Sequence, residues 1–447
     1  MNDPLTFSKM INNDKLKSLL DYDEKNLGNV QVIINSASNS DMSISDEQGE
    51  LIFPDKNIDK YDYGLSLNII KSVLGIGILG ITYTLKQSGY FYLIIMFFLS
   101  LITGYNAVNI GKLVTEFKKI GKYKGIHLTY FNISEEVYGF KMKLLTQFLW
   151  SIEIISCCIL IINLSFTFLK ELFNLSNSIY LLFSIIVFFY SITFIKKYDK
   201  IKFLSIIGLL AIFALFCFLF YNLLNDLSHH NLPKNQYKPF DYNEVLKSIS
   251  ITLFSFGGHV VFPEIFSSIK NPKKLKKNII TTWSFFTIFV ICFVLTGFIL
   301  FGDSICDNIV DNLNKSYWFK KIITFLLLIN IIFTFPLMFT PLNLRIILNI
   351  KSLNINENLK IFLYRYFIRF CLIVIICIIG NYWDSYLNIM SLVGGFLENT
   401  TSIILPTIFS LRYLKLNLFE KTINILILEF GIILFVYTFL NNIKYLF

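Results

Sequence analysis

Residues 67–90 read LNIIKSVLGIGILGITYTLKQSGY and form an apolar stretch that is long enough to cross a bilayer. Three closely spaced glycines, Gly75, Gly77 and Gly80, interrupt this stretch. A lysine, Lys71, lies in its N-terminal half. Hydrocarbon tolerates irregular backbone only where protein buries it or where it lines a water-filled cavity. We therefore expect this stretch to form a broken helix inside a bundle of membrane-spanning helices.

A second apolar stretch, residues 246–269, is interrupted by Gly257, Gly258 and His259 and then by Pro263. Two interrupted segments, about five spans apart, are typical of transporters that are built from an inverted repeat. In such proteins the breaks lie near the middle of the membrane and form the binding site. The pair of stretches therefore predicts a transporter with two broken helices.

The composition agrees with a membrane protein, since 55% of the 447 residues are hydrophobic and 17% are aromatic. A soluble chain of this size could not hide so much apolar surface. Eleven apolar runs have roughly the length that a spanning helix requires. They cover residues 64–86, 89–114, 143–170, 177–195, 202–224, 245–268, 279–302, 319–348, 362–383, 386–411 and 421–440.

The net charge of +10 is spread over alternate loops and does not form one stripe, so it predicts topology and no nucleic-acid partner. The lysine-rich loops follow the second, fourth, sixth and tenth predicted spans. Because such loops stay on the cytoplasmic side, we expect the N-terminus to be cytoplasmic. The opposite side is then extracellular or luminal, which leaves the plasma membrane and a vacuolar or lysosome-like membrane both open.

The N-terminal residues differ from the rest in being polar and poor in aromatic side chains. Such a segment cannot offset its ordering entropy by burial. We predict a disordered cytoplasmic tail over residues 1–62 and a transmembrane domain over residues 63–447.

Four motifs give the chain a resemblance to a known family: NIIKSVLGIGILGITYTLKQSGY (68–90), FSFGGHVVFPEIFSSIKNPKKL (254–275), FTFPLMFTPL (333–342) and SLVGGFLENTTSIILP (391–406). In this order they resemble the first, sixth, eighth and tenth helices of the amino acid/auxin permease family. The resemblance spans nearly the whole chain after residue 63. It implies an all-α polytopic membrane protein with eleven transmembrane helices in a leucine-transporter-type fold. Such a fold has two five-helix inverted repeats, a trailing helix, and breaks in helices 1 and 6. It also implies amino-acid transport.

A broken helix suits an amino-acid ligand. Free backbone N–H groups and a positive half-helix end can hold a carboxylate, and freed carbonyls can accept hydrogen bonds from an ammonium. The expected substrate-binding residues are Leu74, Gly75, Ile76, Gly77, Ser255, Phe256, Gly257, Gly258 and His259. Close helix packing is the alternative explanation for the glycines, and we prefer it for Gly80. A pocket-shaping role is the alternative for His259.

Lys71 lies about one helical turn before Gly75. A lysine inside a span is costly and usually marks a function. The pattern IIKxxxGxGILG resembles the proton-coupled branch of the family, in which an ammonium could take the place of a sodium ion. The alternative is a lysine that extends to the cytoplasmic interface. Asn68 resembles a position used for sodium in another branch, and helix packing is its alternative.

Carboxylic acids inside apolar spans are candidates for carrying protons, and Glu153, Glu264 and Glu398 are such residues. A structural hydrogen bond or ion pair is the alternative for each. Glu429, on the last predicted span, is expected to be peripheral. Thr334 could offer an oxygen to sodium, although Lys71 argues against sodium.

The sequence leaves several functions open. A sodium-coupled or uncoupled amino-acid exchanger is one alternative, and an amino-acid sensor that signals through its N-terminal tail is another. No phosphate-binding loop, metal-ligand spacing or catalytic constellation is present, so we expect neither an enzyme nor a bound metal or cofactor. The expected partners are an amino acid, protons or, as the alternative, sodium, and the lipid bilayer.

Overall fold

The computed structural model describes residues 44–45, 51–52, 64–120, 128–173, 176–194, 198–229, 241–267, 272–313, 317–351, 363–383 and 385–446. The chain divides into two units, Met1–Phe53 and Pro54–Phe447. In the first unit, β1 (Ile44–Ser45) and β2 (Leu51–Ile52) pair in antiparallel register. This short pair is the one described departure from an all-helical chain. Otherwise the prediction of a disordered tail lies outside the described residues.

The second unit is helical throughout its described part. Its first half contains α2 (Gly64–Val73), α3 (Ile78–Ile81), α4 (Tyr83–Ser88), α5 (Tyr92–Phe117), α6 (Tyr130–Tyr138), α7 (Phe140–Leu172), α8 (Asn177–Phe194), α9 (Tyr198–Ser228), α10 (Tyr242–Ser255), η3 (His259–Val261) and α11 (Phe262–Ser267). Its second half contains α12 (Pro272–Phe301), η4 (Gly302–Ser304), η5 (Ile309–Asn312), α13 (Tyr317–Lys351), η6 (Leu363–Phe367), α15 (Ile368–Tyr382), α16 (Tyr386–Leu392), η7 (Val393–Glu398), η8 (Thr400–Ile404), α17 (Leu405–Tyr413) and α18 (Leu418–Leu446).

Eight helices in the described part are long and apolar enough to cross a membrane. They are Tyr92–Phe117, Phe140–Leu172, Gly208–Ser228, Tyr242–Ser267, Lys274–Ser304, Trp318–Pro336, Tyr386–Tyr413 and Leu418–Asn441. The chain is therefore a multi-pass membrane protein. Of the three other predicted spans, the first is divided among α2, α3 and α4, and the fourth and ninth correspond to shorter apolar helices, Asn177–Ser191 and Ile368–Tyr382.

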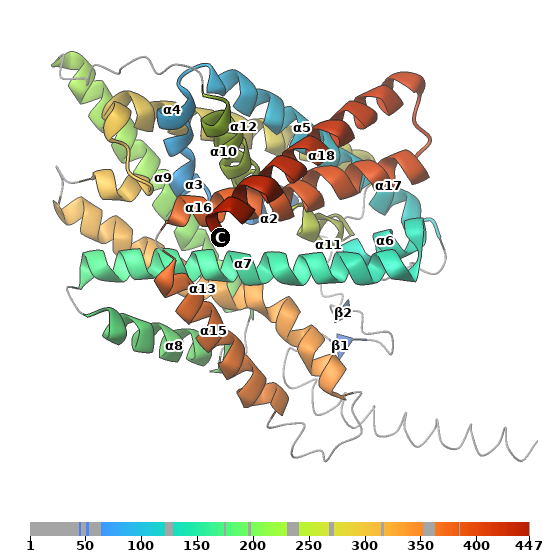
Figure 1. Cartoon of the computed structure of the whole chain (residues 1–447), viewed down its shortest axis with the longest axis horizontal. Helices are drawn as coiled ribbons and strands as arrows, with labels where there is room; N and C mark the ends of the chain where they lie inside the picture. The colour runs from blue at the N-terminus through green and yellow to red at the C-terminus, as the bar shows by residue number, and fades with distance from the viewer. Residues whose placement is uncertain are drawn as a thin grey trace, which may run out of the picture. The chain divides into compact units, whose positions relative to one another are not determined.

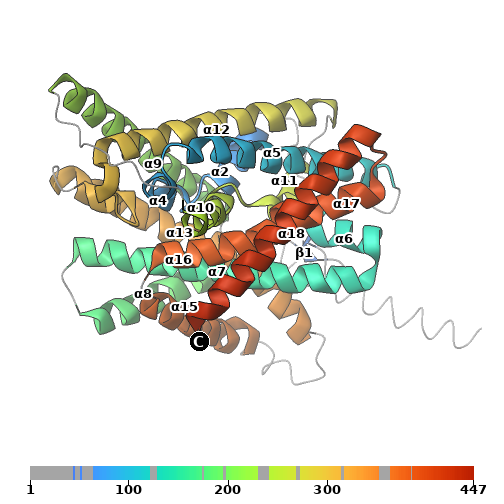
Figure 2. The ribbon, with the colours of Figure 1, turned by 45° about the horizontal axis from the view of Figure 1, so that its top comes forward.

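The degree of burial separates central helices from peripheral ones. In the most apolar 18-residue part of Tyr242–Ser267, 78% of the residues are buried. In the corresponding part of Leu418–Asn441, 28% are buried. Figure 2 shows α10 nearly end-on among its neighbours, with α18 lying across the outside. Large apolar side chains such as Phe97 and Phe98 on α5 are exposed, as expected for a surface that faces hydrocarbon. The core consequently forms around α10.

The long helix α7 has neighbouring helices on two of its sides. It contacts α13 and α15 on one side and η7 and α16 on the other, as can be followed in Figure 1. Its apolar run carries small polar residues that pack inward, among them Ser165, which is buried. This placement brings Glu153, near the middle of α7, into the interior of the unit.

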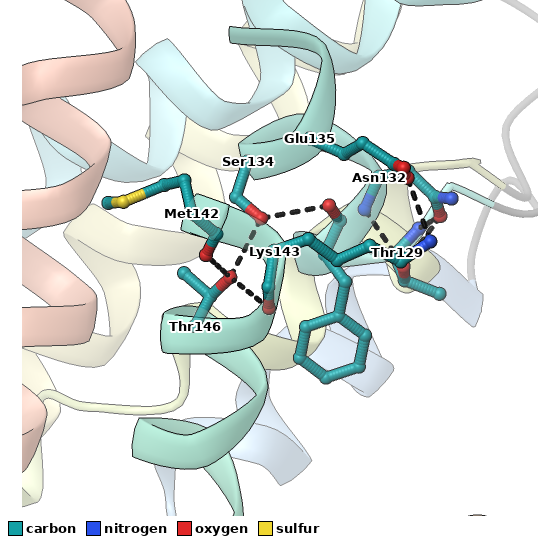
Figure 3. A network of polar contacts seen from close by, with 8 residues as sticks. Thr129, Asn132, Ser134, Glu135, Met142, Lys143 and Thr146 are labelled. Atoms are coloured by element: carbon teal, nitrogen blue, oxygen red, sulfur yellow. Dashed lines mark hydrogen bonds and ion pairs between the residues drawn. The ribbon is translucent and has the colours of Figure 1, made fainter. Parts of the chain in front are cut away.

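A polar network fixes the sharp corner between α6 and α7 (Figure 3). Thr129 caps α6 with a reciprocal box, because its hydroxyl accepts from the Asn132 N–H and its own N–H donates to the Asn132 side chain. The hydroxyls of Ser134 on α6 and Thr146 on α7 are 2.7 Å apart and hydrogen-bonded. These bonds satisfy the free N–H groups at the start of α6 and hold the short helix against the long one.

Candidate functional site

The first helix break separates α2 from α3. Helical structure ends at Val73 and resumes at Ile78, and the N–H of Gly75 donates to the carbonyl of Val73 at 2.8 Å. Among the described residues, no acceptor contacts the N–H groups of Ile76 or Gly77. The predicted break is thus confirmed, and it presents free donors at the start of α3.

The second break follows α10. The helix ends at Ser255, and Gly258 adopts a left-handed backbone conformation with φ of 96° before η3 begins. Glycine accepts this conformation without the steric cost that a side chain would bring. Pro263 then lies in the first turn of α11, where its missing N–H is not needed. The predicted interruption at Gly257–Gly258 is confirmed.

The two breaks contact each other. The Ser255 hydroxyl donates to the carbonyl of Gly77 at 3.1 Å. A Cβ added to Gly77 would lie 2.9 Å from the Ser255 Oγ, and one added to Gly258 would lie 2.9 Å from the carbonyl oxygen of Ser72. Glycine is therefore required at both places by close approach between segments that are far apart in the sequence.

Gly75 differs from the other glycines of the first break, because a Cβ added there would meet nothing within 4 Å. Its neighbour Ile76 has its carbonyl bound by the hydroxyl of Tyr386 on α16, at 2.6 Å. By contrast, Gly80 faces the side chains of Met390, Leu387 and Tyr386, which confirms the packing role expected for it. Open space at Gly75 thus lies next to the free N–H donors of Ile76 and Gly77.

Two predicted ligand-binding side chains of the second break are buried. His259 is fully enclosed, and its Nε2 lies 2.9 Å from the carbonyl oxygen of Thr103 on α5. The carbonyl can only accept, so we assign the ring proton to Nε2, and Nδ1 has no partner in the described part of the chain. Phe256 packs on Trp283 and Phe286. Its role in substrate binding stays a prediction.

Glu398 contacts the second break from η7. Its Oε2 accepts a hydrogen bond of 3.2 Å from the N–H of Gly258. Its carboxyl group lies directly against Gly257, where an added Cβ would be 2.2 Å from the Oε2. Glu398 is 5% exposed, as is Glu153 on α7, and the two side chains are hydrogen-bonded to each other. Sequence reasoning nominated both acids separately and did not foresee this pair.

The segment that carries Glu398 is π-helical, as is η8 after it. Such wide turns are rare and occur frequently at functional sites. Asn106 on α5 stabilises η8 by donating its side-chain amide to the carbonyl of Ser402 at 2.9 Å. Adjacent glycines at Gly394 and Gly395 are the one sequence feature that hints at irregularity here.

The remaining predicted ion-coupling residues are more dispersed. Glu264 on α11 is half-buried, and Thr334 on α13 donates its hydroxyl to Asn330 of the same helix at 3.3 Å. Asn68 and Lys71 belong to α2, but their side chains lie outside what the structure describes. The structure therefore brings Glu398 and Glu153 to the breaks and does not join Thr334 to them.

Glu429 is exposed on α18, which confirms its expected peripheral position. Within the described residues, no three His, Cys, Asp or Glu side chains are grouped as metal ligands.

A separate polar cluster lies in the loop between α12 and α13. Lys320 is 7% exposed and forms an ion pair of 2.9 Å with Glu171 at the end of α7. Burial raises the pKa of Asp311 on η5 to about 6, although nearby Lys320 lowers it in part. Lys86 on α4 donates to the carbonyl of Ile305 at 2.7 Å. The Lys86 bond thus ties this loop to α4, and the Lys320–Glu171 pair joins α13 to α7.

Comparison with known proteins adds independent information. A family model described as "Transmembrane amino acid transporter protein" matches residues 64–444. The chain is 23% identical over 414 residues to amino acid transporter AVT1D of Arabidopsis thaliana, a match that covers 90% of this chain and 72% of the relative. It is 25% identical over 401 residues to amino acid transporter AVT1E of the same plant, a match that covers 86% of this chain and 73% of the relative. A third relative, amino acid transporter AVT1J of Arabidopsis thaliana, is 22% identical over 362 residues, which cover 78% of this chain and 81% of the relative.

Proposed function

Because the chain belongs to the transmembrane amino acid transporter family, we propose that it is a secondary active transporter that couples amino-acid movement to a proton gradient by alternating access. This family consists of transporters and not of enzymes. The amino-acid substrate of the relatives supports the same class of substrate here.

The contact between the two helix breaks is the observation that carries the proposal. The free N–H groups of Ile76 and Gly77 suit the carboxylate of an amino acid, since they need no charged side chain to bind an anion. The space at Gly75 leaves room for a ligand to approach the backbone. Uncommitted carbonyls at the second break, next to Ser255, would accept the ammonium.

We further propose that residues 63–447 form an eleven-helix leucine-transporter-type domain, with residues 1–62 as a cytoplasmic tail. The eight long helices, the interrupted first span and the two shorter apolar helices support this count. The lysine-rich alternate loops support a cytoplasmic N-terminus, and the opposite compartment is the cell exterior or the lumen of a vacuole-like organelle.

Protons are favoured over sodium as the coupling ion for two reasons. Two acids are buried at the second break, and a lysine, Lys71, lies on α2 close to the first. A sodium ion would instead need several oxygens at the junction of α2 and α13. Thr334, the candidate on α13 predicted from the sequence, supplies a single hydroxyl oxygen, and its hydrogen bond goes to Asn330 of the same helix. Sodium coupling through Asn68 and Thr334 is the second proposal.

Uptake of a radiolabelled amino-acid mixture into proteoliposomes tests the proposal. Wild type and Lys71→Ala are compared under an inward proton gradient and under an inward sodium gradient. Lys119→Ala serves as the control, because Lys119 is an exposed lysine that pairs with Glu116 three residues earlier. We expect uptake to follow the proton gradient in wild type and in the control, and to be lost in Lys71→Ala.

Other outcomes assign a different function. Uptake that requires sodium would overturn proton coupling and direct attention to Asn68. Binding of amino acids without flux under either gradient would favour a sensor, for which deletion of residues 1–62 should abolish signalling without affecting binding.

A further inference from the structure

We propose that Glu398 and Glu153 together form the binding site for the transported proton, and that this site controls the second helix break through the N–H of Gly258. The inference rests on the proposed function and names the residues that carry it out. It assigns a different role to each of the two acids.

The first step of the argument is the contact between the two carboxyl groups. A hydrogen bond between carboxyl groups requires a proton on one of them, and the Glu398 and Glu153 side chains are hydrogen-bonded. Each is 5% exposed. Two carboxylates in contact, away from water, cannot both be ionised. The pair therefore carries one shared proton in the resting protein.

The second step is that, among the side chains that the structure describes, no cation holds this proton in place. In the described part of the chain, no lysine or arginine pairs with either acid. The Oε2 of Glu153 is buried and accepts a hydrogen bond from no described donor. Because an unsatisfied buried oxygen makes a charged carboxylate costly, charge is disfavoured on Glu153, which is the acid that keeps the shared proton.

The other ionisable groups near the pair do not compete for this role. Cys157 lies one turn further along α7, and the hydroxyl of Tyr130 on α6 donates to the carbonyl of Thr401. His259 on η3 is turned toward Thr103, and Tyr386 on α16 donates to Ile76. Among the described groups around the pair, the two acids are therefore the ones left to exchange protons.

The third step is the connection to the break. Glu398, and not Glu153, accepts the Gly258 N–H and lies against Gly257. Hydrogen bonds to a charged acceptor are roughly twice as strong as those to a neutral one. When a second proton from one side of the membrane binds Glu398, the pair loses its charge and this bond weakens. Release of the proton to the other side restores the bond.

Proton binding therefore loosens the contact between η7 and the left-handed turn at Gly258, which lies against Ser72 of the first break. One proton is taken up and one is released in each cycle, and the shared proton never leaves. This sequence links occupancy of the proton site to the shape of the amino-acid site.

The roles predict different results for two isosteric variants. Glu398→Gln should remove proton-driven uptake, so that uptake under a gradient equals uptake without one, while exchange of labelled for unlabelled amino acid continues. Glu153→Gln should retain gradient dependence at a lower rate and with a shifted pH profile, since its amide donates to Glu398 in place of the shared proton but cannot exchange it. Glu429→Gln is the control, because Glu429 is an exposed glutamate on α18.

The result that would overturn the inference is full proton-driven uptake in Glu398→Gln. A second contrary result is that Glu398→Gln loses uptake only of the cationic amino acids lysine and arginine. The acids would then bind the side chain of a substrate and not a proton. If wild type shows neither gradient-driven uptake nor exchange, the proposed function itself is wrong, which is a separate outcome.

A second measurement covers the case in which Glu398→Gln does not fold. Infrared difference spectra of the wild-type protein in lipid nanodiscs, between alkaline and acidic buffer, should contain a carboxyl C=O band that changes frequency in Glu398→Asp. Glu153→Gln should keep this band. Glu398→Asp, which preserves the carboxyl group, should retain gradient dependence at a lower rate. Identical carboxyl bands in wild type and Glu398→Asp would contradict the inference.

Discussion

The hydroxyl of Ser255 donates a hydrogen bond of 3.1 Å to the carbonyl oxygen of Gly77, and this bond joins the end of α10 to the break before α3. The two residues are 178 positions apart in the sequence. The bond joins the two interrupted helices, which is the relation that the proposed binding of one amino acid by both breaks requires.

Ser255→Ala tests this relation directly. Loss of the bond should cost about 1 kcal/mol and raise the amino-acid concentration for half-maximal uptake roughly 5-fold. Ser191→Ala is a matched control, because Ser191 is a buried serine that bonds to a carbonyl of its own helix, α8. Uptake kinetics in proteoliposomes measure both. An equal effect of the two substitutions would contradict a specific role for the contact.

Gly75→Ala and Gly77→Ala should behave differently although the residues are two positions apart. A Cβ at Gly77 would be 3.0 Å from the Cα of Ser255, so the variant should unfold at a lower temperature in detergent. A Cβ at Gly75 meets nothing within 4 Å, so its thermal stability should match wild type.

The effect of Gly75→Ala should appear in substrate choice instead. A methyl group in the binding space should reduce uptake of bulky amino acids more than uptake of glycine or alanine. Uptake of both size classes at wild-type rates would show that the space at Gly75 is not part of the binding site.

The contact between Gly257 and Glu398 can be tested by a double-mutant cycle. Gly257→Ala places a Cβ against the carboxyl group and should destabilise the protein by about 1–3 kcal/mol. Glu398→Ala removes the clashing atoms, so the double variant should be more stable than Gly257→Ala alone. Thermal unfolding of the four proteins gives the coupling energy. Additive effects would place the two residues apart.

Asp311 should make stability depend on pH. Its pKa is raised from 3.8 in the unfolded chain to about 6 in the fold, because burial disfavours the charged form. The folded protein then binds more protons between these values, so stability is greatest below about pH 4 and falls as the pH rises toward 6.

Asp311→Asn should remove this dependence and raise the unfolding temperature at pH 7 more than at pH 4. Asp303→Asn is the control, since Asp303 is an exposed acid on the adjacent η4. Thermal unfolding in detergent at the two pH values measures the difference. A wild-type protein that becomes more stable between pH 4 and 6 would contradict the assignment.

The sequence by itself determined the class of protein and the position of both helix breaks. Apolar runs of spanning length have few stable solutions other than membrane helices, and glycine and proline interrupt a helix through local sterics alone. The interruptions at Gly75–Gly77 and Gly257–Gly258 could therefore be predicted without knowledge of their neighbours. The family resemblance added the expectation of an amino-acid substrate, which the family match supports.

Only the tertiary structure decided which of the candidate residues act together. Glu153, Glu264 and Glu398 were all predicted from the sequence as acids in apolar spans, yet two of them meet and the third lies on α11. That pairing depends on the π-helical turn of η7 and on the packing of α7 against it. Both arise from contacts between distant segments, whose energies no local sequence pattern encodes.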